Sequence, residues 1–148
     1  MPRAPFQVLV FLFRQTEGGQ FEFALFKRSD ASYWQGVAGG GEDEETPLQA
    51  AQRETYEEAG ISPSHHYFEL NSLNTVPVAE VCGFLWGQEV LVIPEYCFGV
   101  EINDEHIILS AEHSDIRWTD YETARRLLKW DSNKNAIWEL NFRLTKGS

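Results

Sequence analysis

The sequence GGGEDEETPLQAAQRETYEEAG, residues 39–60, holds seven acidic side chains and a single basic one, Arg53. Carboxylates held close together repel one another, so this concentration of charge costs a folded chain free energy. The order of residues in this stretch should therefore indicate both its secondary structure and the function of its carboxylates.

The middle of this stretch predicts a helix that begins near Thr46 and ends at Gly60. Threonine is a favoured N-cap residue, Pro47 suits the first helical position, and glycine tolerates the left-handed conformation of a C-cap. At roughly 100° per residue, small side chains form one stripe, which we expect to face the core. The stripe comprises Ala51, Thr55 and Ala59.

Three glutamates share a second face of this helix, about 100° wide and beside the stripe. They are Glu54, Glu57 and Glu58. Like charges four residues apart destabilise a helix by about 0.2–0.5 kcal/mol per pair, and a bound cation would relieve that repulsion. Mg²⁺ suits such a site because it binds carboxylate oxygens and bridges them to substrate phosphates. A solvated acidic face is the alternative, and for three glutamates alone it is the more common one.

The spacing of the whole stretch resembles the Nudix box. Gly39, five residues, Glu45, seven residues and then RETYEEAGI, residues 53–61, fill nearly every fixed position of that motif. A pattern with this many specified positions rarely arises by chance. Thr55 stands where an aliphatic residue is usual, and we expect it to weaken packing or to bond back to a helix carbonyl. Glu44 stands where many members have glycine, which predicts an altered loop before the helix.

This resemblance implies the α/β class, with an α/β/α sandwich, a mixed sheet and a loop-helix-loop, as a single domain over residues 1–148. It also implies hydrolysis of a nucleoside diphosphate linked to another group, with Mg²⁺ or Mn²⁺ as the cofactor. By position, Glu54, Glu57, Glu58 and the backbone of Gly39 would hold the metal, while Glu45 and Arg53 would support that cluster. The general base would be Glu54 or Glu57 in the box, or Glu112 in a late loop, where an ordinary exposed acid is the alternative.

Segments outside the box resemble one branch of the family, the dATP and dihydroneopterin triphosphate pyrophosphohydrolases. They are LFKRSDASYWQGVAGG, AEHSDIRWTD and LLKWDSNKNAIWELNFRL, whereas residues 62–88 match poorly. The branch implies cleavage of a nucleoside or pterin triphosphate to a monophosphate and pyrophosphate. A dinucleoside polyphosphate, a nucleotide sugar or a capped RNA end stays open as the substrate. So does a non-catalytic ligand-binding module, although the complete glutamate set argues against it.

Seven residues outside the box are candidates for substrate binding. Lys27 and Arg28 could contact phosphates or make ordinary surface ion pairs. Tyr33 and Trp34 could stack on a flat ring, but for Trp34 a core position is the safer expectation. Asn133, with Trp130 and Asn135, could line the ring pocket, or Asn133 could form a local hydrogen bond.

Composition limits the other possibilities. The chain has 148 residues, 43% hydrophobic, enough for one domain with a substantial core. Its formal net charge of -11 opposes binding to a nucleic-acid backbone. Two cysteines without ligand spacing predict a reducing, cytoplasmic location. The apolar run near the N-terminus has the features of a buried strand rather than of a signal peptide, and no segment is long enough to span a membrane. A homodimer stays open.

The remaining elements follow from hydrophobic patterning. Strands are expected at residues 6–13 and 21–27, joined by a glycine turn, and at 89–102 and 115–118, with Pro94 at an edge, a bend or a break. Helices are expected at 120–130 and 131–144. We assign no ligand role to the four histidines, His65, His66, His106 and His113.

Overall fold

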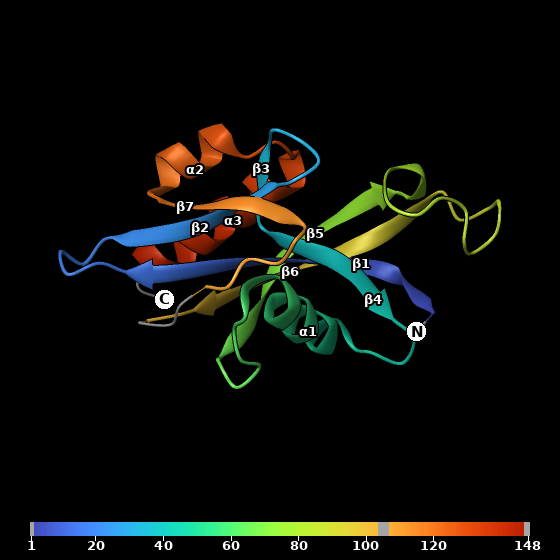
Figure 1. The fold of residues 1–148 in the computed structure, drawn as a ribbon, viewed down its shortest axis with the longest axis horizontal. Coiled ribbons are helices and arrows are strands. Elements are labelled where there is room, and N and C mark those ends of the chain that lie inside the picture. Colours follow the sequence, from blue (N-terminus) through green and yellow to red (C-terminus); the bar gives the residue numbers. More distant parts are fainter. Residues whose placement is uncertain (1, 104–106, 147–148) are drawn as a thin grey trace.

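The computed structural model describes residues 2–103 and 107–146, and it contains one seven-stranded mixed sheet between two layers of helix (Figure 1). Helix α1 lies against one face of the sheet, and α2 and α3 lie against the other. The structure therefore confirms the predicted α/β/α sandwich. Within these residues no helix is both long and apolar enough to cross a bilayer.

The elements follow the chain in the order that Figure 1 shows. They are β1 (Arg3–Gln15), β2 (Phe21–Arg28), β3 (Trp34–Gln35), β4 (Val37–Glu42), α1 (Pro47–Ala59), β5 (Tyr67–Pro77), the short 3-10 helix η1 (Val78–Glu80), β6 (Val92–Glu101), β7 (His113–Thr119), α2 (Tyr121–Leu127) and α3 (Asp131–Thr145).

Strand β1 organises the sheet, because it pairs with three neighbours. It is antiparallel to β4 along its first part and to β2 near its end, and it is parallel to β6 from residue 7 to residue 13. Its side chains alternate between the two faces. Val8, Val10 and Leu12 enter the core beneath α1, while Leu9, Phe11 and Phe13 enter the core beneath α2 and α3.

Helix α1 has the ends that the sequence predicts. The Thr46 side chain accepts a hydrogen bond from the Gln49 N–H, the Gln49 side chain accepts one from the Thr46 N–H, and Pro47 is the first helical residue. Gly60 ends the helix with a left-handed φ of 71°. The small-residue stripe is buried, and the Thr55 hydroxyl donates to the Ala51 carbonyl at 2.7 Å, which confirms the expected back-bond.

Three strands are absent from the sequence prediction: β3, β4 and β5. Strand β4 contains three consecutive glycines, which have low intrinsic strand preference, and it forms because β1 supplies its hydrogen-bond partners. In β5 most side chains are polar or exposed, because only one edge of the strand is paired and little of it is covered. The predicted β6 is too long at its start, and α2 ends at Leu127 rather than at residue 130. Pro94 pairs with β5 just before the pairing of β6 with β1 begins, so it removes no hydrogen bond from that ladder.

Glu44 adopts a left-handed backbone conformation, with a φ of 71°. This is the position at which many proteins with the Nudix box have glycine, and a side chain there is strained. We expect Glu44→Gly to raise the free energy of unfolding by about 0.5–1 kcal/mol in a urea titration. The matched control is Asp43→Gly at the neighbouring exposed residue, which lies outside that conformation and should lose stability instead. Equal losses in both variants would contradict the strain at Glu44.

Candidate active site

Arg53 on α1 forms hydrogen bonds with three of the acidic side chains in the stretch 39–60. Its Nε and Nη2 atoms donate to the two carboxylate oxygens of Glu45 at 2.7 and 3.0 Å. Its Nη1 atom donates to Glu54 at 3.0 Å and to Glu57 at 3.2 Å, and Nη2 also donates to the Gly40 carbonyl at 2.9 Å. The guanidinium therefore holds three carboxylates and strand β4 in one arrangement.

Glu45 joins this network to the loop before α1. Its carboxylate accepts a hydrogen bond from the Glu42 N–H at 2.8 Å as well as those from Arg53. The Arg53 guanidinium, followed by the Glu42 N–H, holds the pKa of Glu45 below its ordinary value, so the group is ionised at neutral pH. This geometry suits the supporting position that the resemblance implies for Glu45 and Arg53.

Gly39 on β4 lies directly against the Glu54 carboxylate. A Cβ atom at Gly39 would overlap that carboxylate, so the close approach needs a residue without a side chain. The backbone of Gly39 and the carboxylate of Glu54, two of the expected metal ligands, are therefore neighbours.

Glu58 lies deeper than the other two glutamates of the helix. Its side chain is 3% exposed, against 14% for Glu54 and 54% for Glu57. Neither oxygen of Glu58 has a hydrogen-bond donor among the described residues, whereas the Glu54 carboxylate is placed to accept a hydrogen bond from a protonated Glu58. Burial, and then the neighbouring Glu54, raise the pKa of Glu58 well above its ordinary value. Glu58 is therefore protonated at neutral pH unless a cation compensates its charge.

Residues from outside the box surround the buried end of this cluster. The side chain of His113 on β7 places Nε2 at 3.6 Å from Oε1 of Glu58, and burial lowers the pKa of His113. Arg28 at the end of β2 donates to both oxygens of Asp30, at 2.8 and 2.9 Å. Glu112 precedes His113, and Arg28 pairs with His113 in the β2–β7 ladder. Their charges act on the pKa of Glu58 with opposite signs.

The cluster has the chemistry of a cation site, although the ligands are not gathered around one point. Among residues 2–103 and 107–146, no three His, Cys, Asp or Glu side chains converge as the ligands of an ion would. Glu54 and Glu57 instead turn their oxygens to Arg53. The buried, unpartnered carboxyl of Glu58 beside Glu54, however, needs either a proton or a cation, and oxygen ligands with a nearby backbone suit Mg²⁺ or Mn²⁺. The residues present thus fit a divalent cation.

Lys27 and Arg28 point to opposite faces of the sheet. Phe23 and Leu25 share a face of β2 with Lys27, and they pack beneath α2 and α3. Phe26 shares the opposite face with Arg28, and it packs beneath α1. Only Arg28 therefore lies on the side of the acidic cluster. Lys27 belongs to the side on which the aromatic candidates lie.

Tyr33, Trp34 and Trp130 gather where the connection after β2 meets the start of α3. The rings of Tyr33 and Trp130 meet edge to face with centroids 5.6 Å apart, and the Lys129 ammonium lies within 6 Å of both. Trp34 packs against the core beneath α2 and α3, as expected for a core residue. Asn133 is 3% exposed and accepts a hydrogen bond from the Gly36 N–H at 2.9 Å, so in this structure it joins α3 to the sheet.

Glu95 on β6 is a buried acid that the sequence analysis does not identify. It is 5% exposed, and Oε1 has no hydrogen-bond partner among the described residues. Cys97, two residues later, packs beneath α3, so Glu95 faces the same side of the sheet. Burial raises the pKa of Glu95, and a hydrogen bond with Ser132 at the start of α3 partly offsets this rise. In the sequence, the only sign that Glu95 is buried is its place among the inward-facing residues of a predicted strand.

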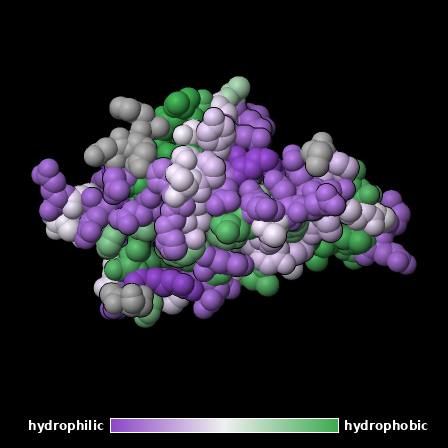
Figure 2. Space-filling model, turned by 90° about the horizontal axis from the view of Figure 1, so that it is seen from below, coloured by the Kyte–Doolittle hydropathy of each residue, from purple (hydrophilic) through white to green (hydrophobic). Residues whose placement is uncertain are grey.

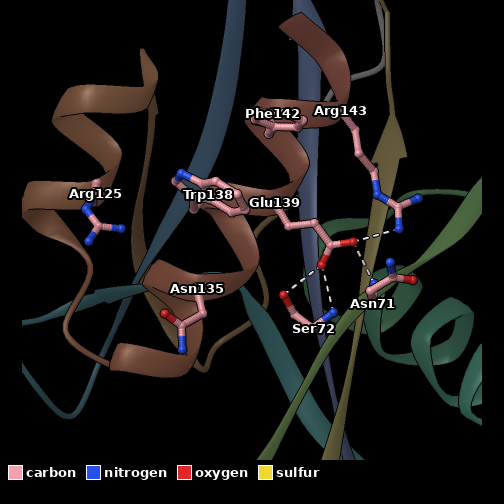
Figure 3. A pocket seen from close by; sticks show the side chains of 8 residues that line it. All are labelled: Asn71, Ser72, Arg125, Asn135, Trp138, Glu139, Phe142 and Arg143. Carbon is pink, nitrogen blue, oxygen red and sulfur yellow. Dashed lines mark hydrogen bonds and ion pairs between the residues drawn. The ribbon is translucent and has the colours of Figure 1, made fainter. Parts of the chain in front are cut away.

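A hollow of about 680 Å³ lies over α3, between α2 and β5, away from the acidic cluster. Figure 3 shows Glu139 among the residues that line it, where it accepts hydrogen bonds from the backbone of Asn71 and Ser72 and pairs with Arg143. Asn135 also lines this hollow, so it is not part of the aromatic group. Helix α1 lies on the other face of the sheet, and Figure 2 shows that side of the molecule, which hydrophilic residues cover in large part.

The remaining histidines and the cysteines lie elsewhere. His65 bonds to the Ser62 carbonyl, and His66 stacks on Phe68. His106 lies outside the described residues. Cys82 and Cys97 are free thiols rather than a disulfide. His113 is thus the histidine that the structure places against a candidate ligand, because the fold brings β7 next to α1.

The metal-free protein should lose stability as pH rises from about 6.5 to about 8.5. An acid whose folded-state pKa is raised binds more protons in the folded protein than in the unfolded one, so its contribution decreases with rising pH. Glu58 and Glu95 both belong to this class. One such group lowers the free energy of unfolding by at most about 1.4 kcal/mol per pH unit. His113, whose pKa is lowered, destabilises the protein only below about pH 6.5.

Urea unfolding in the presence of EDTA measures this slope. Glu58→Gln should flatten it, because the amide does not titrate. An equal slope in wild type and variant would show that Glu58 is ionised in the metal-free protein.

Comparisons with known proteins agree with this geometry. The family model of the NUDIX domain matches residues 5–139. Dihydroneopterin triphosphate diphosphatase of Escherichia coli K12 is 30% identical over 91% of each chain. The crystal structure of a NUDIX hydrolase from Listeria monocytogenes superposes with a TM-score of 0.88, at 42% identity over 97% of each chain. The structure of the E. coli dihydroneopterin triphosphate pyrophosphohydrolase superposes with a TM-score of 0.77, at 25% identity over 95% of this chain and 99% of the other. This chain belongs to the Nudix family.

Proposed function

We propose that this chain hydrolyses a phosphoanhydride bond of dihydroneopterin triphosphate, or of a nucleoside triphosphate of similar shape, to pyrophosphate and a monophosphate. The observation that carries the proposal is the acidic cluster on one face of α1, in which Arg53 holds Glu54 and Glu57, Gly39 lies against Glu54, and Glu58 is buried. The relative from E. coli, which bears the name of this activity, matches this chain over nearly its full length.

Water is the nucleophile in this reaction. Its oxygen forms a bond to phosphorus, the bridging P–O bond breaks, and one water proton moves to a carboxylate of the protein. We assign that carboxylate to Glu54, because it lies against the backbone of Gly39 and Arg53 fixes its orientation. The hydrogen bond from Arg53 reaches only one oxygen of Glu54, Oε1, at 3.0 Å.

A divalent cation bound at the cluster would neutralise charge on the substrate phosphates and make the attacking water more acidic. Glu54, Glu57, Glu58 and the backbone of Gly39 would hold it. Arg53 keeps two of these carboxylates near each other, and Glu45 keeps Arg53 in place through two hydrogen bonds. Arg28 adds positive charge on the same side, where it suits a phosphate of the substrate.

The ring of the substrate would lie toward the start of α3. Tyr33 and Trp130 present aromatic surface there, with Lys129 beside both rings. A flat pterin or purine gains stacking energy from such rings. We propose that Trp34 and Asn133 shape this region from behind, because Trp34 packs on the core and Asn133 bonds to the backbone of Gly36. Lys27 also lies on this side of the sheet.

A substrate panel in Mg²⁺ or Mn²⁺ tests the proposal. It compares dihydroneopterin triphosphate, dATP, other nucleoside triphosphates, a dinucleoside polyphosphate and ADP-ribose, with products identified by anion-exchange chromatography. We expect the highest kcat/KM for a triphosphate, with one pyrophosphate released per turnover. Faster hydrolysis of the dinucleoside polyphosphate or of ADP-ribose would overturn the proposed substrate class, and no hydrolysis of any compound would overturn the enzymatic role.

Glu112 should contribute to turnover from outside the box. It precedes β7, its carbonyl accepts a hydrogen bond from the Ser29 N–H at 2.9 Å, and its charge lies close enough to influence Glu58. We expect Glu112→Gln to lower kcat by about 10-fold to 100-fold, since a nearby carboxylate helps to hold the cation or to accept a proton. Glu122→Gln, at an exposed position on α2, is the matched control and should leave kcat unchanged. An unchanged kcat in Glu112→Gln would mean that Glu112 is an ordinary loop acid.

A further inference from the structure

Two buried polar side chains face each other at the inner end of the acidic cluster, and the carboxylate of Glu58, which has Glu54 beside it, has no hydrogen-bond donor there. The carboxyl oxygens of Glu58 and both ring nitrogens of His113 make no hydrogen bond within the described part of the chain. Their side chains are 3% and 1% exposed, so water does not replace the missing bonds. A buried polar group without a partner costs about 1–3 kcal/mol, and native proteins keep few of them.

The two groups are close to bonding distance. Nε2 of His113 lies 3.6 Å from Oε1 of Glu58, somewhat beyond the usual range for a hydrogen bond. A small rotation of the carboxyl group would bring the two atoms within range. Arg53 does not compete for Glu58, because its ion pairs reach Glu42, Glu45, Glu54 and Glu57 within the described residues. The charges of Glu54, Glu112 and Arg28 also act on Glu58, but none of these groups forms an ion pair with it there.

The position of His113 is fixed by its surroundings. The residue pairs with Arg28 in the β2–β7 ladder, and its ring packs against the ring of Phe26 with centroids 5.3 Å apart. Its backbone N–H donates to the Ser110 carbonyl at 3.2 Å, which holds the turn before β7. The imidazole therefore cannot swing away, and the flexible member of the pair is Glu58.

We propose that His113 is a positioning residue, whose Nε2–H donates a hydrogen bond to the ionised Glu58 and aims this carboxylate at the divalent cation. The inference rests on the proposed function, because it assumes that Glu58 is a metal ligand. Carboxylates that bind metals are commonly held by a hydrogen bond from a residue behind them, and loss of such a partner costs about 10-fold to 100-fold in metal affinity. Charge-assisted hydrogen bonds in a dry environment are also the stronger kind.

The test is Mn²⁺ binding, measured by electron paramagnetic resonance of the free ion, without substrate. His113→Leu removes the donor at similar volume, and we expect the Mn²⁺ Kd to rise about 10-fold or more. His113→Gln keeps an N–H donor near the position of Nε2, and its Kd should stay within about threefold of wild type. If His113 had a merely structural role, His113→Leu would lower the free energy of unfolding of the metal-free protein in urea. We expect this variant to be as stable as wild type or more stable, because it removes two ring nitrogens that make no hydrogen bond.

A double-mutant cycle with Glu58→Gln decides whether His113 acts through Glu58. In the Glu58→Gln background, His113→Leu should change the Mn²⁺ Kd by less than about twofold. A Kd for His113→Leu equal to that of wild type, an equal loss in His113→Gln, or an undiminished loss in the Glu58→Gln background would each overturn the inference. Absence of Mn²⁺ binding and of turnover in wild type would overturn the proposed function itself.

Discussion

Glu54→Gln should lower kcat by about 1,000-fold and leave the fold intact. The amide has nearly the same size as the carboxylate and can still accept the hydrogen bond that Nη1 of Arg53 now donates at 3.0 Å. It cannot carry the negative charge that a cation needs, and it cannot accept a proton from water. Kinetics with a triphosphate substrate in Mg²⁺ measure the loss, and circular dichroism with urea unfolding shows that the variant is folded.

Two comparisons sharpen this result. Glu57→Gln should also reduce kcat, because it removes a second carboxylate, although Glu57 is the more exposed of the two. Glu122→Gln makes the same chemical change at an exposed position on α2 and should have no effect. A folded Glu54→Gln variant with kcat within threefold of wild type would mean that Glu54 neither binds the cation nor accepts the proton.

Features that depend on neighbours along the chain could be predicted from the sequence. The ends of α1 are an example, because Thr46, Pro47 and Gly60 act through local backbone geometry. The back-bond of Thr55 is another, since its partner lies one turn away. Strands β4 and β5 escaped prediction because their residues have weak intrinsic strand preference. Their hydrogen bonds come from β1 and β6, which the local sequence does not specify.

The candidate site divides in the same way. The spacing of the box predicts that Arg53 and Glu54 lie together with Gly39, and the structure shows these contacts. The contact of His113 with Glu58 could not be predicted, because 54 intervening residues separate them. It depends on the pairing of β7 with β2 and on backbone hydrogen bonds from the loop before β7 to the end of α1. The separation of Lys27 from Arg28 follows from strand alternation, but it needs the strand itself to be known.

Arg53→Gln should both destabilise the protein and abolish most of its turnover. Three carboxylates would lose their common partner, and the Gly40 carbonyl would lose a donor. Removing one member of an enclosed ion-pair network costs about 3 kcal/mol, because the charges left behind are unpaired. With its side chain 22% exposed, Arg53 is enclosed enough for a loss of that order. Urea unfolding measures the stability, and kcat should fall by at least about 100-fold, since Glu54 and Glu57 lose their fixed orientation.

Two further variants separate geometry from charge in this network. Arg53→Lys keeps the charge but cannot donate two parallel hydrogen bonds to Glu45, so its stability and kcat should fall between those of wild type and Arg53→Gln. Arg14→Gln breaks the more exposed pair with Glu22 and removes the guanidinium from over the Trp118 ring, for which about 1 kcal/mol in all and no change in kcat are expected. If Arg53→Gln were no less stable than Arg14→Gln and retained its turnover, the guanidinium would not organise the acidic cluster. The carboxylates would then have to be held by the cation alone.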